Sequence, residues 1–184
     1  MSSSKIIPYG KQDISAEDVE FVTEVLKSEW LTQGPIVPKL EKAIANYVGS
    51  NFCSLVNSAT SALHISCLAI GLKEGDIVWT SPNTFVASAN CAKLCGAKVD
   101  FVDIDELTFN MSTEALEEKL VKAKTENCLP KVVIPVHMAG QSCDMKKIFE
   151  LSKKYNFKII EDASHALGGE YLNKKVGSCH YSDI

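Results

Sequence analysis

The chain has 184 residues, which suits one domain or one domain with part of another. Hydrophobic residues make up 46% of it and charged residues 23%, as in ordinary soluble globular proteins. The formal net charge of -4 gives no general attraction for a phosphate backbone, so we expect no nucleic-acid partner.

The N-terminal stretch and the cysteines bear on location. The opening M-S-S-S-K-I-I-P-Y-G lacks the apolar core of a secretory signal or a membrane anchor, and the longest apolar stretches are too short to span a bilayer. The seven cysteines are irregularly spaced and include no C-x-x-C pair, which is typical of reduced thiols in the cytosol. We therefore predict a cytoplasmic protein with no membrane contact and no metal site.

Two helices are expected at the start of the chain. Ser15 can cap a helix over residues 15–28, and Asp18, three residues later, completes a variant of the capping box. A T-Q-G-P turn then ends helix propagation, because glycine and proline are turn formers. A second amphipathic helix is expected over residues 36–48.

After Gly49, short apolar runs alternate with helical stretches. The expected strands cover residues 52–56, 77–80, 99–102, 132–136 and 157–160, the expected helices cover residues 57–72, 83–95, 112–122 and 144–154, and a hairpin or loop is expected over residues 170–176. Unbroken apolar strands separated by helices predict an α/β fold in three layers, with a mainly parallel sheet covered on both faces. We therefore divide the chain into an N-terminal helical segment, residues 1–48, and an α/β region, residues 49–184.

Parallel sheets bind ligands at the carboxyl ends of their strands, so the residues that follow each strand are the candidates for a site. N-S-A-T-S-A-L-H, residues 57–64, follows the first expected strand and opens a helix. The free N–H groups of such a first turn, with the hydroxyls of Thr60 and Ser61, could cradle a phosphate. The alternative is an ordinary helix cap by Asn57 or Ser58.

Further blocks reach the same edge. Phe85, expected in the first turns of a helix, either stacks on a flat aromatic ring or packs in the core. Asp162, in E-D-A-S-H-A-L-G, would need a hydrogen-bonding or cationic partner if buried, such as a protonated pyridine nitrogen, and His165 could donate to a phenolate-like oxygen. The alternative for this pair is a helix cap and a surface histidine. We expect His137 to be a hydrogen-bonded structural histidine and assign it no chemical role.

Several blocks, in this order, resemble a known family. They are L-T-Q-G-P-I-V-P-K-L-E, N-S-A-T-S-A-L-H, F-V-D-I-D, V-H-M-A-G-Q-S-C-D-M, E-D-A-S-H-A-L-G and K-K-V-G-S, and they run from about Pro8 to the last residue. Together they resemble the DegT/StrS family, which are fold type I sugar-nucleotide aminotransferases that use pyridoxal 5'-phosphate (PLP). The second and fifth blocks and Y-L-N-K-K-V-G favour members that act in pseudaminic acid biosynthesis.

The resemblance implies roles for the matching positions. Thr60 and Ser61 would bind the PLP phosphate, and Phe85 would stack on the ring. Asp162 would pair with the pyridinium nitrogen and keep it protonated, and His165 would contact the ring oxygen. A second set would line the sugar-nucleotide site, including that of a partner subunit: Tyr9, Glu29, Trp30, Leu31, Thr32 and Ala59.

The family's covalent PLP lysine is expected in a block just beyond Ile184. Residues 49–184 would then be an incomplete, truncated PLP-binding large domain of fold type I, with its C-terminal part and the small domain farther on. Lys174 and Lys175 match the family's K-K-V-G and are not substitutes. We therefore expect no transamination from these 184 residues alone.

The implied activity is PLP-dependent transfer of an amino group, with glutamate as the expected donor, to C4 of a UDP-linked 4-keto-6-deoxy sugar. The full-length protein is expected to be a homodimer. Two alternatives remain open: a PLP-dependent sugar dehydratase of the same fold, in which a histidine replaces the lysine, and a non-catalytic binding or regulatory relative. The sequence that follows Ile184 would distinguish them.

Overall fold

The structure, a computed structural model, describes residues 11–184, and Tyr9 lies outside them. The chain divides into two compact units, of which the first ends at Lys39 and the second begins at Leu40. This point lies within helix α2, Ile36–Val48. The division after residue 48 that the sequence pattern suggests stays a prediction.

The first unit contains helix α1, Ala16–Lys27. Its predicted capping box is confirmed, because the Asp18 N–H donates to Ser15 Oγ at 3.2 Å and the Ser15 N–H donates to Asp18 Oδ2 at 2.8 Å. None of the residues of α1 is buried. Its apolar side chains therefore gain no core packing within the described residues.

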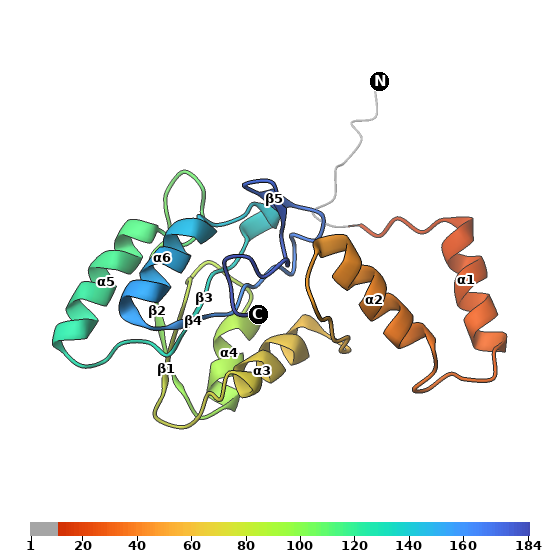
Figure 1. Cartoon of the computed structure of the whole chain (residues 1–184), viewed down its shortest axis with the longest axis horizontal. Coiled ribbons are helices and arrows are strands. Elements are labelled where there is room, and N and C mark those ends of the chain that lie inside the picture. Colours follow the sequence, from red (N-terminus) through yellow and green to blue (C-terminus); the bar gives the residue numbers. More distant parts are fainter. Residues whose placement is uncertain (1–10) are drawn as a thin grey trace, which may run out of the picture. The chain divides into compact units, whose positions relative to one another are not determined.

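The second unit is built on a four-stranded sheet in which every pairing is parallel, as predicted (Figure 1). The strands are β1, Ile77–Thr80; β2, Lys98–Phe101; β3, Val132–Ile134; and β4, Lys158–Ile159. Their order across the sheet is β2-β1-β3-β4. A parallel bridge between Val136 and Asp162 extends the β3–β4 pairing to the carboxyl ends of these strands.

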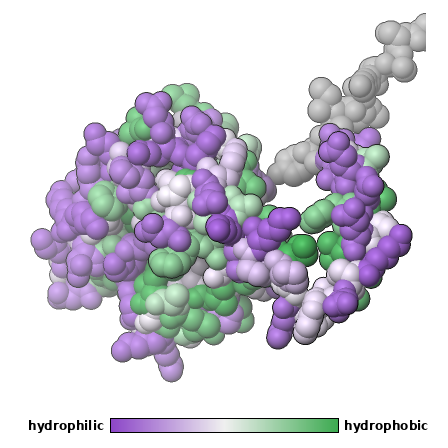
Figure 2. Space-filling view, turned by 45° about the vertical axis from the view of Figure 1, so that its right-hand side comes forward, coloured by the Kyte–Doolittle hydropathy of each residue, from purple (hydrophilic) through white to green (hydrophobic). Residues whose placement is uncertain are grey.

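Helices cover both faces of this sheet, which gives the predicted three layers (Figure 1). They are α3, Ala59–Ala69; α4, Ala87–Leu94; α5, Thr113–Thr125; and α6, Met145–Tyr155. Successive strand residues point to opposite faces. Val78 and Val132 accordingly pack with α3 and α4, while Trp79 and Val133 pack with α5 and α6. Hydrophilic residues cover much of the outer surface of this unit, with apolar areas between them (Figure 2).

The first expected strand is wrong. Residues 52–56 form no strand, and the Phe52 side chain is 90% exposed. A strand needs a neighbour that accepts its backbone hydrogen bonds. Here the Leu55 N–H donates instead to the side-chain Oε1 of Glu41 at 2.9 Å. The apolar pattern was therefore insufficient, because no strand among the described residues pairs with this segment.

The remaining elements are short. A 3-10 turn, η1, Met138–Gly140, follows β3, and the expected hairpin forms from β5, Glu170–Tyr171, and β6, Lys174–Lys175. The last residues run beside β4, where the Asp183 N–H donates to the Ile159 carbonyl at 3.0 Å. Within residues 11–184, no helix has the length and apolar character needed to cross a membrane.

Candidate functional site

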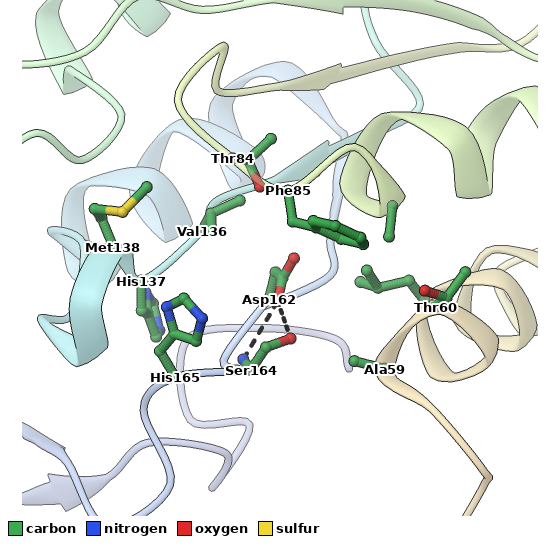
Figure 3. A pocket seen from close by; sticks show the side chains of 12 residues that line it. Ala59, Thr60, Thr84, Phe85, Val136, His137, Met138, Asp162, Ser164 and His165 are labelled. Carbon is green, nitrogen blue, oxygen red and sulfur yellow. Dashed lines mark hydrogen bonds between the residues drawn. The ribbon is translucent and has the colours of Figure 1, made fainter. Parts of the chain in front are cut away.

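A cavity opens at the carboxyl ends of β1, β3 and β4, where a parallel sheet is expected to bind ligands (Figure 3). Its walls come from the first turn of α3, the loop before α4, the segment after β3 and the segment after β4. The lining residues are Ala59, Thr60, Leu63, Thr84, Phe85, Ala87, Val136, His137, Met138, Asp162, Ser164 and His165.

The first turn of α3 presents free N–H groups to this cavity. Ser58 is the helix cap, and its hydroxyl oxygen accepts the Ser61 N–H at 3.1 Å. The Ala59 and Thr60 N–H groups have no acceptor among residues 11–184, and both residues line the cavity. Such a pair at a helix N-terminus favours an anion, because the N–H groups and the helix dipole both point toward it.

Ser61, which was predicted to bind the phosphate together with Thr60, is placed differently. The Ser61 hydroxyl donates to Asn57 Oδ1 at 2.8 Å, and Ser61 is not among the residues that line the cavity. Its hydroxyl is therefore committed to the turn that precedes α3. The Thr60 side chain is exposed and faces the cavity (Figure 3).

Asp162 is the buried acid of the cavity, with 7% of its surface exposed. Its Oδ2 accepts the Ser88 hydroxyl at 2.7 Å, and its Oδ1 accepts the Ser164 hydroxyl at 2.7 Å and the Ser164 N–H at 3.3 Å. Within residues 11–184 it forms no ion pair with a lysine. A carboxylate can accept about four hydrogen bonds, so three protein donors leave room for one from a ligand.

A chain of hydroxyl groups fixes one side of this carboxylate. The Ser88 hydroxyl has a single proton, and the carboxylate at 2.7 Å is a stronger acceptor than the Phe85 carbonyl at 3.3 Å. Ser88 therefore donates to Asp162. It follows that Thr84, whose Oγ1 lies 2.8 Å from Ser88 Oγ, donates its own proton to Ser88.

Phe85 and His165 both line the cavity with their rings (Figure 3). Phe85 lies in the loop before α4 and not in its first turns as predicted, because the helix begins at Ala87. Its side chain is 75% exposed, so it does not pack in the core. An exposed flat ring over a cavity is suited to stacking on a planar ligand.

His137 also borders the cavity, but both of its ring nitrogens are engaged by other protein groups. Its Nε2 lies 2.7 Å from Glu161 Oε1, and its Nδ1 accepts the Cys143 N–H at 3.2 Å. The side chain is fully buried. Burial raises the pKa of the neighbouring Cys143 thiol to about 12, so this group stays protonated and donates to the Val136 carbonyl at 3.2 Å.

The structure thus brings together Thr60, Ala59, Phe85, Asp162 and His165 from the predicted site. Glu29, Trp30, Leu31 and Thr32 belong to the first unit, where Trp30 and Leu31 are exposed, and their approach to a sugar-nucleotide site stays a prediction. The sequence interpretation missed Thr84, Ser88 and Ser164. A signal was available for Ser88, since residues 83–95 were predicted to be helical and residues three apart lie on the same side of a helix.

A family model described as the DegT/DnrJ/EryC1/StrS aminotransferase family matches residues 12–183. A Campylobacter jejuni protein named UDP-4-amino-4,6-dideoxy-N-acetyl-beta-L-altrosamine transaminase is 46% identical over 173 residues, which cover 94% of this chain and 45% of that relative. The chain therefore spans a little under half the length of this curated relative.

Solved structures also match most of this chain, over less than half of their own length. Helicobacter pylori PseC, described as an aminotransferase involved in the biosynthesis of pseudoaminic acid, aligns with a TM-score of 0.84 and 34% identity over 94% of this chain and 45% of that protein. A Bacillus subtilis protein, ntda, with bound cofactor PMP, aligns with a TM-score of 0.79 and 30% identity over 92% of this chain and 37% of its own. The α/β fold expected from the sequence is confirmed over this length.

Proposed function

Because this chain belongs to the DegT/DnrJ/EryC1/StrS aminotransferase family, we propose that it forms the PLP-binding part of a sugar-nucleotide transaminase. The observation that carries the proposal is one cavity that combines free helix N–H groups, an exposed aromatic ring and a buried carboxylate without a cationic partner among residues 11–184. PLP has a matching set of groups: a phosphate, a flat ring and a ring nitrogen that can carry a proton.

The phosphate fits the first turn of α3. The unpaired N–H groups of Ala59 and Thr60 and the Thr60 hydroxyl would hold it, and no lysine is needed at this end. Ser61, the other residue implied by the family, would act through its hydrogen bond to Asn57, which holds the turn.

The ring nitrogen fits Asp162. A buried carboxylate is costly without a positive or hydrogen-bonding partner, and a protonated pyridine nitrogen would supply both. The Ser88 and Ser164 hydroxyls would hold the carboxylate in place, because both donate to it. Phe85 would cover one face of the ring, and His165 would donate to the ring oxygen.

When bound, PLP supplies an electron sink for the substrate carbon, and a protonated ring nitrogen makes that sink effective. The task of these residues is to hold the proton at that nitrogen, orient the ring and anchor the phosphate. The lysine that binds PLP covalently in the family is expected outside these residues, so the 184-residue chain should bind PLP weakly and reversibly and should not transaminate.

For the whole protein we propose glutamate as the amino donor and C4 of a UDP-linked 4-keto-6-deoxy sugar as the acceptor, as in pseudaminic acid biosynthesis. The similarity to the Campylobacter and Helicobacter proteins supports the choice of sugar. We further propose a cytoplasmic homodimer. The seven free cysteines support the location, and the exposed apolar face of α1 supports the association.

The test compares Asp162→Asn with Asp183→Asn in the full-length protein. Both changes remove one carboxylate, but Asp183 does not line the cavity. It pairs with Lys158 at 2.7 Å and accepts the Ile159 N–H at 2.9 Å, and asparagine keeps one oxygen that can accept this N–H. Asp162→Asn should abolish most turnover while retaining more of the PLP, because a neutral amide cannot hold a pyridinium proton. Asp183→Asn should behave as wild type. Normal turnover in Asp162→Asn would overturn the assignment.

A further inference from the structure

Two neighbouring acidic residues follow β4, and their side chains point in different directions. Asp162 turns into the cavity, whereas Glu161, the residue before it, turns to the His137 ring. The Glu161 side chain is 10% exposed and the His137 side chain is fully buried. The proposed function assigns no task to this buried pair.

The hydrogen bonds define the protonation of the pair. The Cys143 N–H donates to His137 Nδ1 at 3.2 Å, so this nitrogen carries no proton. The proton therefore sits on Nε2 and is donated to Glu161 Oε1 at 2.7 Å. The second oxygen of Glu161 accepts the Ser182 hydroxyl at 3.0 Å. The pair is a neutral imidazole bound to a carboxylate whose two oxygens are both engaged.

His137 also binds Asp162 through the main chain. Its N–H donates to the Asp162 carbonyl at 3.1 Å, and the Asp162 N–H donates to the Pro135 carbonyl at 3.0 Å. One residue therefore holds the backbone of Asp162 and the side chain of Glu161 at once. The backbone of Glu161 is fixed as well, because its N–H donates to the Ile184 carbonyl at 2.8 Å.

This arrangement fixes the direction in which the Asp162 side chain points. Successive residues of an extended strand point to opposite sides, so Glu161 held toward His137 leaves Asp162 facing the cavity. Rotation of the strand end would break the Glu161–His137 bond and leave a buried charge unpaired, which is costly. A misplaced Asp162 would therefore cost the hydrogen bond between the Glu161 and His137 side chains.

We propose that His137 and Glu161 are positioning residues that aim the Asp162 carboxylate at the ring nitrogen of the bound cofactor. This inference rests on the proposed function of the cavity. It gives a task to a histidine that borders the site without a free nitrogen for chemistry.

The test uses the full-length protein, PLP labelled with ¹⁵N in the ring, and three variants. Glu161→Leu removes the acceptor of His137, Glu161→Gln keeps an oxygen for it, and Ser182→Ala removes only the outer hydrogen bond. The dissociation constant of PLP and the ¹⁵N chemical shift, which reports protonation of the ring nitrogen, are measured for each. Ile148→Val, a buried change on α6 outside the cavity, is the control for lost stability.

Glu161→Leu should weaken PLP binding by about tenfold and move the ¹⁵N shift toward the unprotonated value, as Asp162→Asn does. Glu161→Gln should restore both measurements, and Ile148→Val should lower the melting temperature without moving the ¹⁵N shift. If Glu161→Leu does not fold, Ser182→Ala should still weaken binding by about threefold with a partial ¹⁵N change.

The outcomes separate the two claims. A wild-type protein that binds no PLP, or an Asp162→Asn variant with an unchanged ¹⁵N shift, would remove the proposed function. Wild-type binding with a normal Asp162→Asn effect, but an unchanged ¹⁵N shift in the folded Glu161 and Ser182 variants, would overturn only the positioning role.

Discussion

Ser88 and Asp162 are 74 residues apart in the chain, and their side chains share a hydrogen bond of 2.7 Å. Ser88 lies in the first turn of α4 and Asp162 at the end of β4, and both are buried. The bond therefore joins two separate walls of the cavity at its carboxylate. The direction of Asp162 depends on the helix as well as on the strand that carries it.

Ser88→Ala should loosen this junction. The change leaves Asp162 with Ser164 as its remaining side-chain partner, and the loss of a hydrogen bond to a charged group costs about 1.5–3 kcal/mol. The free energy of unfolding should fall by an amount of that order, and the full-length protein should bind PLP more weakly. Ser152→Ala is the matched control, since Ser152 is also buried but donates within α6. A PLP affinity equal to wild type in Ser88→Ala would contradict the prediction.

Gly140→Ala should disturb the segment that carries His165. Gly140 has φ of +88°, and a Cβ placed on it would lie 2.8 Å from the His165 carbonyl oxygen. Gly71, with φ of +77° and no atom within 4 Å of its added Cβ, isolates the backbone effect. Gly71→Ala should cost about 1–2 kcal/mol of unfolding free energy. Gly140→Ala should cost clearly more in chemical denaturation and should also weaken PLP binding. Equal losses of unfolding free energy in the two variants would contradict this prediction, because the close contact with the His165 carbonyl oxygen would then add no cost.

Tyr171 should make stability depend on alkaline pH. Burial, together with the hydrogen bond from its hydroxyl to Asp144, raises the pKa of Tyr171 to about 12, above the ordinary value of about 10. A raised folded-state pKa contributes stability that is complete below about pH 10 and is lost as the pH rises through about 12. Tyrosinate absorbance, measured as wild type minus Tyr171→Phe, should show this late ionisation.

Asp144→Asn provides the matched variant for that titration. Asparagine caps a helix as well as aspartate does, so the start of α6 should be retained. The negative charge beside Tyr171 is lost, and the pKa of Tyr171 should move part of the way back toward its ordinary value, because burial remains. A Tyr171 ionisation near pH 10 in the wild type would contradict the assigned environment.

Val22→Ser should weaken self-association of the full-length protein. Val19, Val22 and Leu26 are 58%, 56% and 64% exposed and recur at helical spacing on α1. Glu24→Ser introduces the same residue on the opposite side of the helix, so it controls for helix propensity. Sedimentation should show a homodimer for wild type and Glu24→Ser and a larger monomer fraction for Val22→Ser. A stable and active wild-type monomer would remove the dimer proposal.

Local signals predicted the helices well. Ser15 and Ser112 are caps in the structure as in the prediction, because a capping hydroxyl needs only the N–H groups three residues ahead. A strand depends on a neighbour that sequence pattern does not supply. Residues 77–80 found partners and residues 52–56 did not, although both runs are apolar.

The site was predictable where topology governs it. Thr60, Phe85 and Asp162 meet because all three follow strands or open helices at the same edge of the sheet. The Thr84–Ser88–Asp162 chain was not predictable, because small hydroxyl residues are common at helix starts and their partners lie far away in sequence. The contact between Glu161 and His137 was not predictable either, because these two residues also lie far apart in the sequence.

The strand order has a consequence for synthesis on the ribosome. β1 pairs with β2 on one side, but its other neighbour is β3, and Thr80 donates to the Ile134 carbonyl across 54 residues. At about 5–20 residues per second, one edge of β1 waits several seconds for its partner after it has emerged. Unpaired strand edges recruit other chains. Between the synthesis of β1 and that of β3 the nascent protein therefore carries an unpaired strand edge, and a chaperone that covers this edge in that interval should raise the yield of folded protein.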